Sequence, residues 1–207
     1  CNTLVRNMGA TIKVGITGGI GSGKSTICRL FKEKFDIPIY YSDIWAKELM
    51  STKSELIDSI RLLLGPESYH LDGKLNTRYI AAKVFNDKTL LEGLNSIVHP
   101  AVEKHFKEWA SRKNTPYVLY ESAILFESGS NVNFDKTITV YADLEERIKR
   151  TMSRDACSRE EVIRRINTQI SDEQKKLMSN YIINNNPGEN IEEQVSNIHR
   201  YLLTFFI

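Results

Sequence analysis

The sequence contains little that is typical of an extracellular or membrane protein. Its three cysteines, Cys1, Cys28 and Cys157, are odd in number and widely spaced among 207 residues. They form neither a complete disulfide framework nor a C-x-x-C metal or redox pair, so we expect reduced side chains and a cytoplasmic location. No apolar run approaches the roughly 20 residues that span a bilayer. The opening residues also lack the apolar stretch of a secretory signal.

An excess of charge of either sign is also lacking. Lys and Arg number 28 against 26 for Asp and Glu, and the sequence pI is 8.4. Dedicated nucleic-acid binders are far more basic, so we expect neither a nucleic-acid partner nor a membrane partner. With 41% hydrophobic residues the chain can bury a core, and its length corresponds to about 1.4 average domains. We expect one embellished domain, as a monomer or weak homo-oligomer, preceded by a leader or tag remnant over residues 1–10.

The apolar pattern alternates between strand-like and helix-like segments. Strands are predicted over 11–17, 37–41, 117–121, 136–143 and 181–183, and helical periodicity lies between and after them. Such alternation is typical of an α/β protein with a parallel sheet covered on both faces. The block 67–114 is helical throughout and reads as an insertion, in which Pro100 is predicted to open a further helix. The stretch 144–179 is also helical and is rich in Arg and Lys.

A glycine-rich loop stands between the first predicted strand and the first helix. Gly18-Gly-Ile-Gly-Ser-Gly-Lys-Ser25 satisfies G-x-x-x-x-G-K-[ST], the phosphate-binding P-loop motif. Glycines allow successive N–H groups to point inward and bind phosphate oxygens at the positive end of a helix. Lys24 is then expected to reach the β- and γ-phosphates of a nucleotide, and the Ser25 hydroxyl to ligate Mg²⁺. The alternative is a glycine-rich turn that binds no ligand.

Guanine-nucleotide motifs are missing, because no Asp is followed three residues later by Gly and no Asn is followed by Lys. An adenine-nucleotide phosphotransferase or ATPase is left. Its acceptor hydroxyl needs a carboxylate, and Asp43 follows the second strand at the edge where ligands of open α/β sheets gather. The alternative for Asp43 is a helix N-cap, with Ser42 competing. Glu121 closes the third strand and is either a water-mediated Mg²⁺ partner or a solvated strand end.

Three arginines recur at helical spacing after the fourth strand. Arg147, Arg150 and Arg154 share one face, which predicts either a cover over the ATP phosphates or a solvated face paired with nearby glutamates. The residues predicted to bind ATP are Gly19, Ile20, Gly21, Ser22, Gly23, Lys24, Ser25, Thr26, Arg150 and Arg154.

Taken together, the motifs resemble those of dephospho-coenzyme A kinases, P-loop kinases of the nucleoside-monophosphate-kinase type. The resemblance runs from Ile12 to about Leu203. Its anchors are Thr17-Gly-Gly-Ile-Gly-Ser-Gly-Lys-Ser-Thr26, Ser42-Asp43-Ile-Trp-Ala, Asp72-Gly-Lys-Leu-Asn76, Val84-Phe85, His99-Pro100, Ile124-Leu-Phe-Glu127, Arg150-Thr-Met-Ser-Arg154, Arg165-Ile-Asn-Thr-Gln169 and Tyr181-Ile-Ile-Asn-Asn185.

The resemblance implies transfer of the ATP γ-phosphoryl group to the ribose 3′-hydroxyl of dephospho-CoA, the last step of CoA synthesis. It also implies a five-stranded parallel core over 11–66, 115–143 and 180–207, a CoA-binding helical insertion over 67–114 and a helical lid over 144–179. Asp43 matches the family's catalytic base, and Lys24 and Arg150 match its phosphate-contacting residues. The substrate-binding residues that it implies are Asp43, Arg78, His99 and Glu121.

The chain departs from the family pattern at several positions. Tyr41-Ser-Asp43 stands where the family has Asp-Ala-Asp, and Thr77 followed by Arg78 stands where it has a single substrate-contacting arginine. The family's Asp-x-Pro-Leu-Leu-Phe-Glu reads Glu121-Ser-Ala-Ile-Leu-Phe-Glu127 here, and Asn180 replaces an Asp. Two other readings stay open: another nucleoside-monophosphate or metabolite kinase, and a nucleotide-binding regulatory module.

Overall fold

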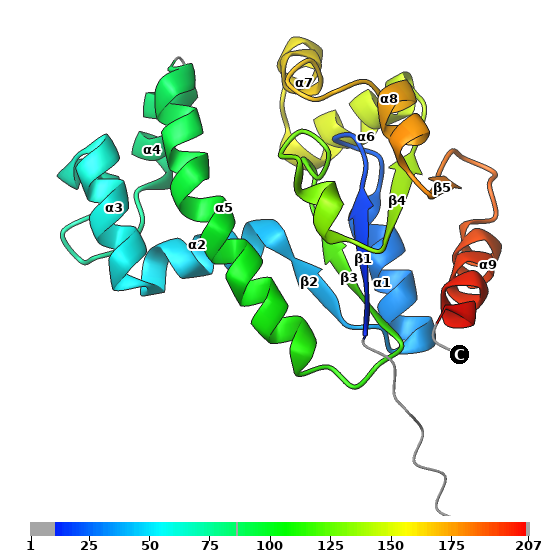
Figure 1. The fold of residues 1–207 in the computed structure, drawn as a ribbon. Helices are drawn as coiled ribbons and strands as arrows, with labels where there is room; N and C mark the ends of the chain where they lie inside the picture. The colour runs from blue at the N-terminus through cyan, green and yellow to red at the C-terminus, as the bar shows by residue number, and fades with distance from the viewer. Residues whose placement is uncertain (1–10, 86, 206–207) are drawn as a thin grey trace, which may run out of the picture. The chain divides into compact units, whose positions relative to one another are not determined.

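A computed structural model describes residues 11–85 and 87–205, which divide into two units (Figure 1). One unit contains the chain up to Tyr40 and from Lys113 onward, and the other spans Tyr41–Arg112. The expected leader over residues 1–10 lies outside the described residues.

The first unit is built on a sheet of five strands, β1 (Ile12–Thr17), β2 (Ile39–Tyr41), β3 (Tyr117–Glu121), β4 (Lys136–Tyr141) and β5 (Tyr181–Asn184). Their order is β2-β3-β1-β4-β5, and β1 pairs in parallel with both β3 and β4. The pairing of β4 with β5 is parallel as well. The α/β class and the predicted five-stranded sheet are confirmed, and each strand lies within or close to its predicted range.

The core of this unit lies between the sheet and two helices, α1 (Lys24–Phe35) and α9 (Ile191–Thr204), which pack against each other. Ile27 and Phe31 of α1, one turn apart, are completely buried, as are Val14 and Ile16 of β1. This apolar stripe is what the helical periodicity predicts. On β1 a side chain at Gly15 would collide with Leu125, so the segment after β3 packs directly onto the central strand.

The predicted helical pattern over 144–179 is divided among three helices, α6 (Leu144–Asp155), α7 (Arg159–Ile166) and α8 (Asp172–Met178). The helix α6 ends at Asp155, and the next residue, its C-cap Ala156, adopts a left-handed conformation with φ 51°. Ser158 and Ser171 then begin α7 and α8, each with a capping box that satisfies free N–H groups. Ile148 of α6 and Lys175 of α8 are fully buried, so both helices pack into the unit.

The second unit is helical, with α2 (Ser42–Thr52), α3 (Ser54–Leu64), the short 3₁₀ helix η1 (Pro66–Ser68), α4 (Thr77–Phe85) and α5 (Lys88–Ser111). A stripe of Leu94, Val98, Val102, Phe106 and Ala110 is buried along α5, which contacts α2, α3 and α4. The unit begins earlier than the predicted insertion 67–114, because α2 and α3, which lie within the predicted core segment 11–66, pack on α5.

The prediction that Pro100 opens a helix is wrong, since Pro100 lies inside the single long helix α5. Proline removes one helical hydrogen bond and crowds the preceding turn. The buried stripe continues on both sides of it, at Val98 and Val102, so tertiary packing outweighs this local cost. Within the described residues no helix, α5 included, is both long enough and apolar enough to cross a membrane.

Candidate active site

The P-loop leaves β1 at the carboxyl end of the sheet and leads into α1. Gly23 is the N-cap of α1, with φ 92°, and Gly21 has φ 79°. Both values lie in the region that glycine adopts most readily. A side chain at Gly23 would overlap the Asn185 side-chain amide, and one at Gly21 would overlap the carbonyl of Arg147. The loop therefore needs glycine at these positions both for its torsions and for close packing.

Lys24 and Ser25 are the first two residues of α1. Lys24 Nζ donates to the carbonyl oxygen of Gly18 at 2.8 Å, so the side chain lies back along the loop. Ser25 is exposed, and Thr26 donates its backbone N–H to Gly23. The first N–H groups of a helix have no earlier carbonyl within it and carry its positive dipole end. The loop and α1 thus have the form of an anion-binding site.

The predicted arginine face divides into three different environments. Arg147 is buried, donates from Nε to the Ile20 carbonyl at 2.9 Å and pairs with Asp172. Arg150 pairs with Glu146 at 2.8 Å and donates to the Asn185 carbonyl. Its Nη1 is buried and has no hydrogen-bond partner among the described residues.

Arg154, the third member, is exposed and pairs with Asp155, which also accepts from Arg165. These two guanidinium groups lower the pKa of Asp155, the hydrogen bond from Arg154 acting most strongly. Of the two arginines predicted to bind ATP, Arg150 lies beside Gly23 and Arg154 belongs to this exposed cluster. On α6, Arg147 and Arg150 therefore lie against the P-loop, whereas Arg154 belongs to an exposed, paired cluster.

Glu121 ends β3 directly opposite Ile16 in the sheet register, and the next residue, Ser122, donates to the Ile16 carbonyl. The charges of Glu121 and Lys24 both affect the pKa of the buried thiol of Cys28 in α1. Burial raises its pKa, the negative charge of Glu121 adds to the rise, and Lys24 opposes it. Glu121 and Lys24 therefore act on the same buried point below the P-loop.

The remaining predicted residues lie in the helical unit. Asp43 is exposed in the first turn of α2, whose N-cap is Tyr41 and carries no side-chain cap bond. The alternative in which Asp43 caps this helix is therefore wrong. Arg78 is exposed in the first turn of α4. His99 is half-buried in α5, and this burial lowers its pKa, which favours the neutral imidazole.

The sequence pattern does not point to several residues that contact or support the P-loop. Gln169 accepts from the Ile20 N–H at 3.0 Å, and Asn185 donates to the Ser22 carbonyl at 2.8 Å. Fully buried Lys175 pairs with Glu127 at 2.6 Å. The only sequence signal for Gln169, Asn185 and Glu127 was their place in stretches that resemble the family. Nothing in the pattern distinguished Lys175 from its neighbour Lys176.

The described residues offer oxygen atoms but no preformed metal cage. Within 11–85 and 87–205, no group of three or more His, Cys, Asp or Glu side chains is arranged to hold a metal ion. The exposed Ser25 hydroxyl at the start of α1 is the one predicted ligand.

Comparison with known proteins extends the match well beyond the P-loop. The sequence profile of dephospho-CoA kinases matches residues 12–191. A dephospho-CoA kinase from Bacteroides fragilis is 38% identical over 192 residues, which cover 92% of this chain and 93% of that protein. A crystal structure of a Thermus thermophilus protein has a TM-score of 0.80 at 32% identity, covering 95% of this chain and 98% of that one. A dephospho-CoA kinase from Campylobacter jejuni, with a TM-score of 0.69 at 22% identity over 94% and 98%, shares the fold.

Proposed function

The chain belongs to the dephospho-CoA kinase family, and from this premise we propose how its own residues carry out the reaction of that family. The protein is an ATP-dependent kinase of dephospho-CoA. In the reaction, the ribose 3′-oxygen forms a bond to the γ-phosphorus of ATP and the bond from that phosphorus to the β-γ bridging oxygen breaks. The hydroxyl proton is released, and the products are CoA and ADP.

The observation that carries this proposal is the P-loop between β1 and α1, with Arg150 beside its last glycine. Phosphoryl transfer depends on positioning and on stabilising charge on the transferred oxygens. We assign ATP binding to the loop 19–26, with Lys24 turning from the Gly18 carbonyl to the phosphates. Arg150, whose buried Nη1 has no hydrogen-bond partner among residues 11–85 and 87–205, supplies a second positive charge there.

Asp43 is assigned the role of catalytic base. Its carboxylate is exposed in the first turn of α2 and is not engaged as a helix cap. A carboxylate can accept the proton as the hydroxyl attacks. We assign substrate binding to Arg78 and to His99 as well, so that the helical unit 41–112 recognises dephospho-CoA. The stretch 144–179 is assigned as the lid.

We also propose that the reaction uses Mg²⁺, held by Ser25. This ion prefers oxygen ligands, keeps several waters and commonly binds through substrate phosphates with one or two protein oxygens. The exposed hydroxyl of Ser25 fits that requirement, and Glu121 could act through a bound water. Bound Mg²⁺ would neutralise charge on the transferred phosphoryl group. We further propose a cytoplasmic monomer or weak homo-oligomer without a nucleic-acid partner. Light scattering of the purified protein would test its oligomeric state.

The decisive experiment is a coupled ADP-release assay with four acceptors, dephospho-CoA, shikimate, AMP and dTMP. Stimulation by dephospho-CoA alone is the expected result, and mass spectrometry of the product should locate the phosphate on the ribose 3′-oxygen. If dephospho-CoA fails while another acceptor succeeds, the substrate assignment is wrong. ATP binding without any transfer would favour a regulatory module instead.

A further inference from the structure

One residue of the P-loop, Ile20, has both of its backbone polar groups bound by side chains. The N–H of Ile20 donates to Gln169 Oε1 at 3.0 Å, and its carbonyl accepts from Arg147 Nε at 2.9 Å. Ile20 stands between Gly19 and Gly21, whose backbones are freer than those of other residues. Without these two bonds this part of the loop would sample many conformations.

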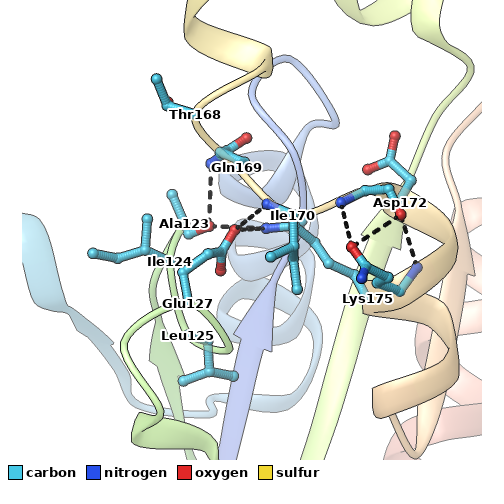
Figure 2. Close-up of polar contacts among 12 residues, drawn as sticks. Ala123, Ile124, Leu125, Glu127, Thr168, Gln169, Ile170, Asp172 and Lys175 are labelled. Atoms are coloured by element: carbon cyan, nitrogen blue, oxygen red, sulfur yellow. Dashed lines mark hydrogen bonds and ion pairs between the residues drawn. The ribbon is translucent and has the colours of Figure 1, made fainter.

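The side-chain amide of Gln169 also joins a partly buried network of polar contacts (Figure 2). Gln169 Nε2 donates to the Ala123 carbonyl at 3.2 Å, and Lys175 Nζ donates to the same oxygen at 3.3 Å. Lys175 Nζ also donates to Glu127 Oε1 at 2.6 Å, which accepts from the Ile170 N–H at 3.2 Å. The Lys175–Glu127 ion pair therefore sets the position of both the Ala123 carbonyl and the backbone next to Gln169.

A second set of contacts begins on the same short helix. Asp172 of α8 accepts from Arg147 Nη1, and Arg147 in turn binds the Ile20 carbonyl. The side chain of Arg147 is 3% exposed, and that of Lys175 is fully buried. A side chain at Gly19 would overlap the Arg147 guanidinium, so the loop and the arginine are packed together.

A buried ion pair is a costly way to gain stability, because desolvation of the two charges offsets most of their attraction. Glu127 Oε2 is in addition buried without a hydrogen-bond partner among the described residues. We therefore attribute this network to the positioning of the P-loop and not to a gain in the stability of the fold. Restraining a flexible loop before its ligand arrives lowers the entropy cost of binding.

We propose that Gln169, supported by the Lys175–Glu127 ion pair, is a positioning residue that holds the P-loop in its phosphate-binding shape before ATP arrives. In this view Gln169 and α8 belong to the fixed frame of the nucleotide site, although they lie within the stretch 144–179 assigned as the lid. The inference rests on the proposed use of the P-loop for ATP and does not depend on the identity of the acceptor.

The first test compares Gln169→Met with Gln174→Met. Gln174 lies five residues away and bonds to Ser171 within its own capping box, so it is a matched control for the loss of one amide in this segment. We expect Gln169→Met to weaken ATP and ADP binding about 5- to 20-fold by calorimetry, the worth of one or two lost hydrogen bonds. The KM for ATP should rise accordingly, and the KM for dephospho-CoA should stay within about twofold.

Equal nucleotide affinities in the two variants would overturn the proposal, as would tighter binding in Gln169→Met. The latter result would mean that Gln169 competes with ATP for the loop. Calorimetry with ATP alone tests the role of Gln169 without any acceptor. The acceptor assay on the unmodified protein tests the proposed substrate, so the two proposals can fail independently.

The second test removes the support of Gln169 through Lys175→Met, with the adjacent Lys176→Met as a control of equal charge. Lys176 lies over the ring of Tyr141 and is partly exposed. We expect Lys175→Met to weaken nucleotide binding and to lower the Tm by on the order of 10 °C, because Glu127 loses its partner. A lower Tm with unchanged nucleotide affinity in the folded variant would contradict the link from Lys175 to the loop.

Discussion

The candidate functional residues of the two units differ in how many protein contacts restrain their side chains. In the sheet unit, Lys24, Arg147 and Gln169 are each bonded to a backbone atom of the P-loop, and much of their support is buried. In the helical unit, Asp43 and Arg78 are exposed in the first turns of two helices. The P-loop is thus held by protein contacts without a ligand, whereas the residues assigned to the acceptor are exposed to solvent.

Asp43→Asn should have the largest effect and the most selective one. Removing a general base lowers kcat by about 10²–10⁴-fold, and ATP binding should stay within about twofold because the P-loop is untouched. Rapid-quench kinetics and calorimetry measure the two quantities separately. Glu48→Gln, an exposed carboxylate further along the same helix, serves as the control. Near-normal turnover of Asp43→Asn would refute its role as base.

Lys24→Ala should disable the sheet unit without unfolding it. Loss of a charge that stabilises the transferred phosphoryl group lowers kcat by about 10²–10³-fold. The Tm should change little, because Lys24 is only partly buried and lies in the first turn of α1. Exposed Lys32 of the same helix offers Lys32→Ala as a control. An unchanged rate together with a lower Tm would assign Lys24 a purely structural role.

Arg150→Ala and Arg154→Ala test whether position on α6 decides function. Arg150 lies beside Gly23, and its buried Nη1 has no hydrogen-bond partner within the described part of the chain, whereas Arg154 belongs to the exposed cluster with Asp155. We expect kcat/KM for ATP to fall about 10- to 100-fold for Arg150→Ala and considerably less for Arg154→Ala. Equal losses in steady-state assays would show that both arginines reach the phosphates, as the sequence pattern predicted.

The smallest effect concerns acid stability. Burial lowers the pKa of His199, which stacks on Phe35 and is hydrogen-bonded to Tyr117. Below the ordinary histidine value of 6.5 the unfolded chain therefore binds a proton more readily than the folded protein, so stability is lost as the pH falls.

His199→Phe keeps the ring and removes this titration, so its Tm should decline less between pH 7.5 and 5.5, by about a few degrees. Thermal unfolding followed by circular dichroism across this range measures the slope for both proteins. His99 and His105, whose pKa values are also lowered by burial, stay in both. Identical slopes would show that His199 contributes nothing to acid sensitivity.

Local signals made most of the fold predictable. The strands followed from β-branched runs, α1 from Ile27 and Phe31 at helical spacing, and the P-loop from its glycines next to Lys24. The course of α5 through Pro100 was not predictable, because the buried stripe that sustains it contacts helices distant in the sequence. The grouping of α2 and α3 with that helix has the same origin.

The amino-acid sequence alone indicates the chemistry of this protein: a phosphate-binding loop, a lysine and serine at the start of a helix, and an acid after the second strand. Each of these is a short-range pattern whose residues are adjacent in the chain. Packing of distant segments, in contrast, decides that Arg147 and Arg150 lie against the loop while Arg154 pairs with Asp155. It also decides that Gln169 contacts the loop and that Lys175 supports Gln169. The contacts with the loop join residues more than 40 positions apart, as does the contact from Lys175 to Glu127. Spacing along one helix can predict a shared face, but what that face meets depends on packing.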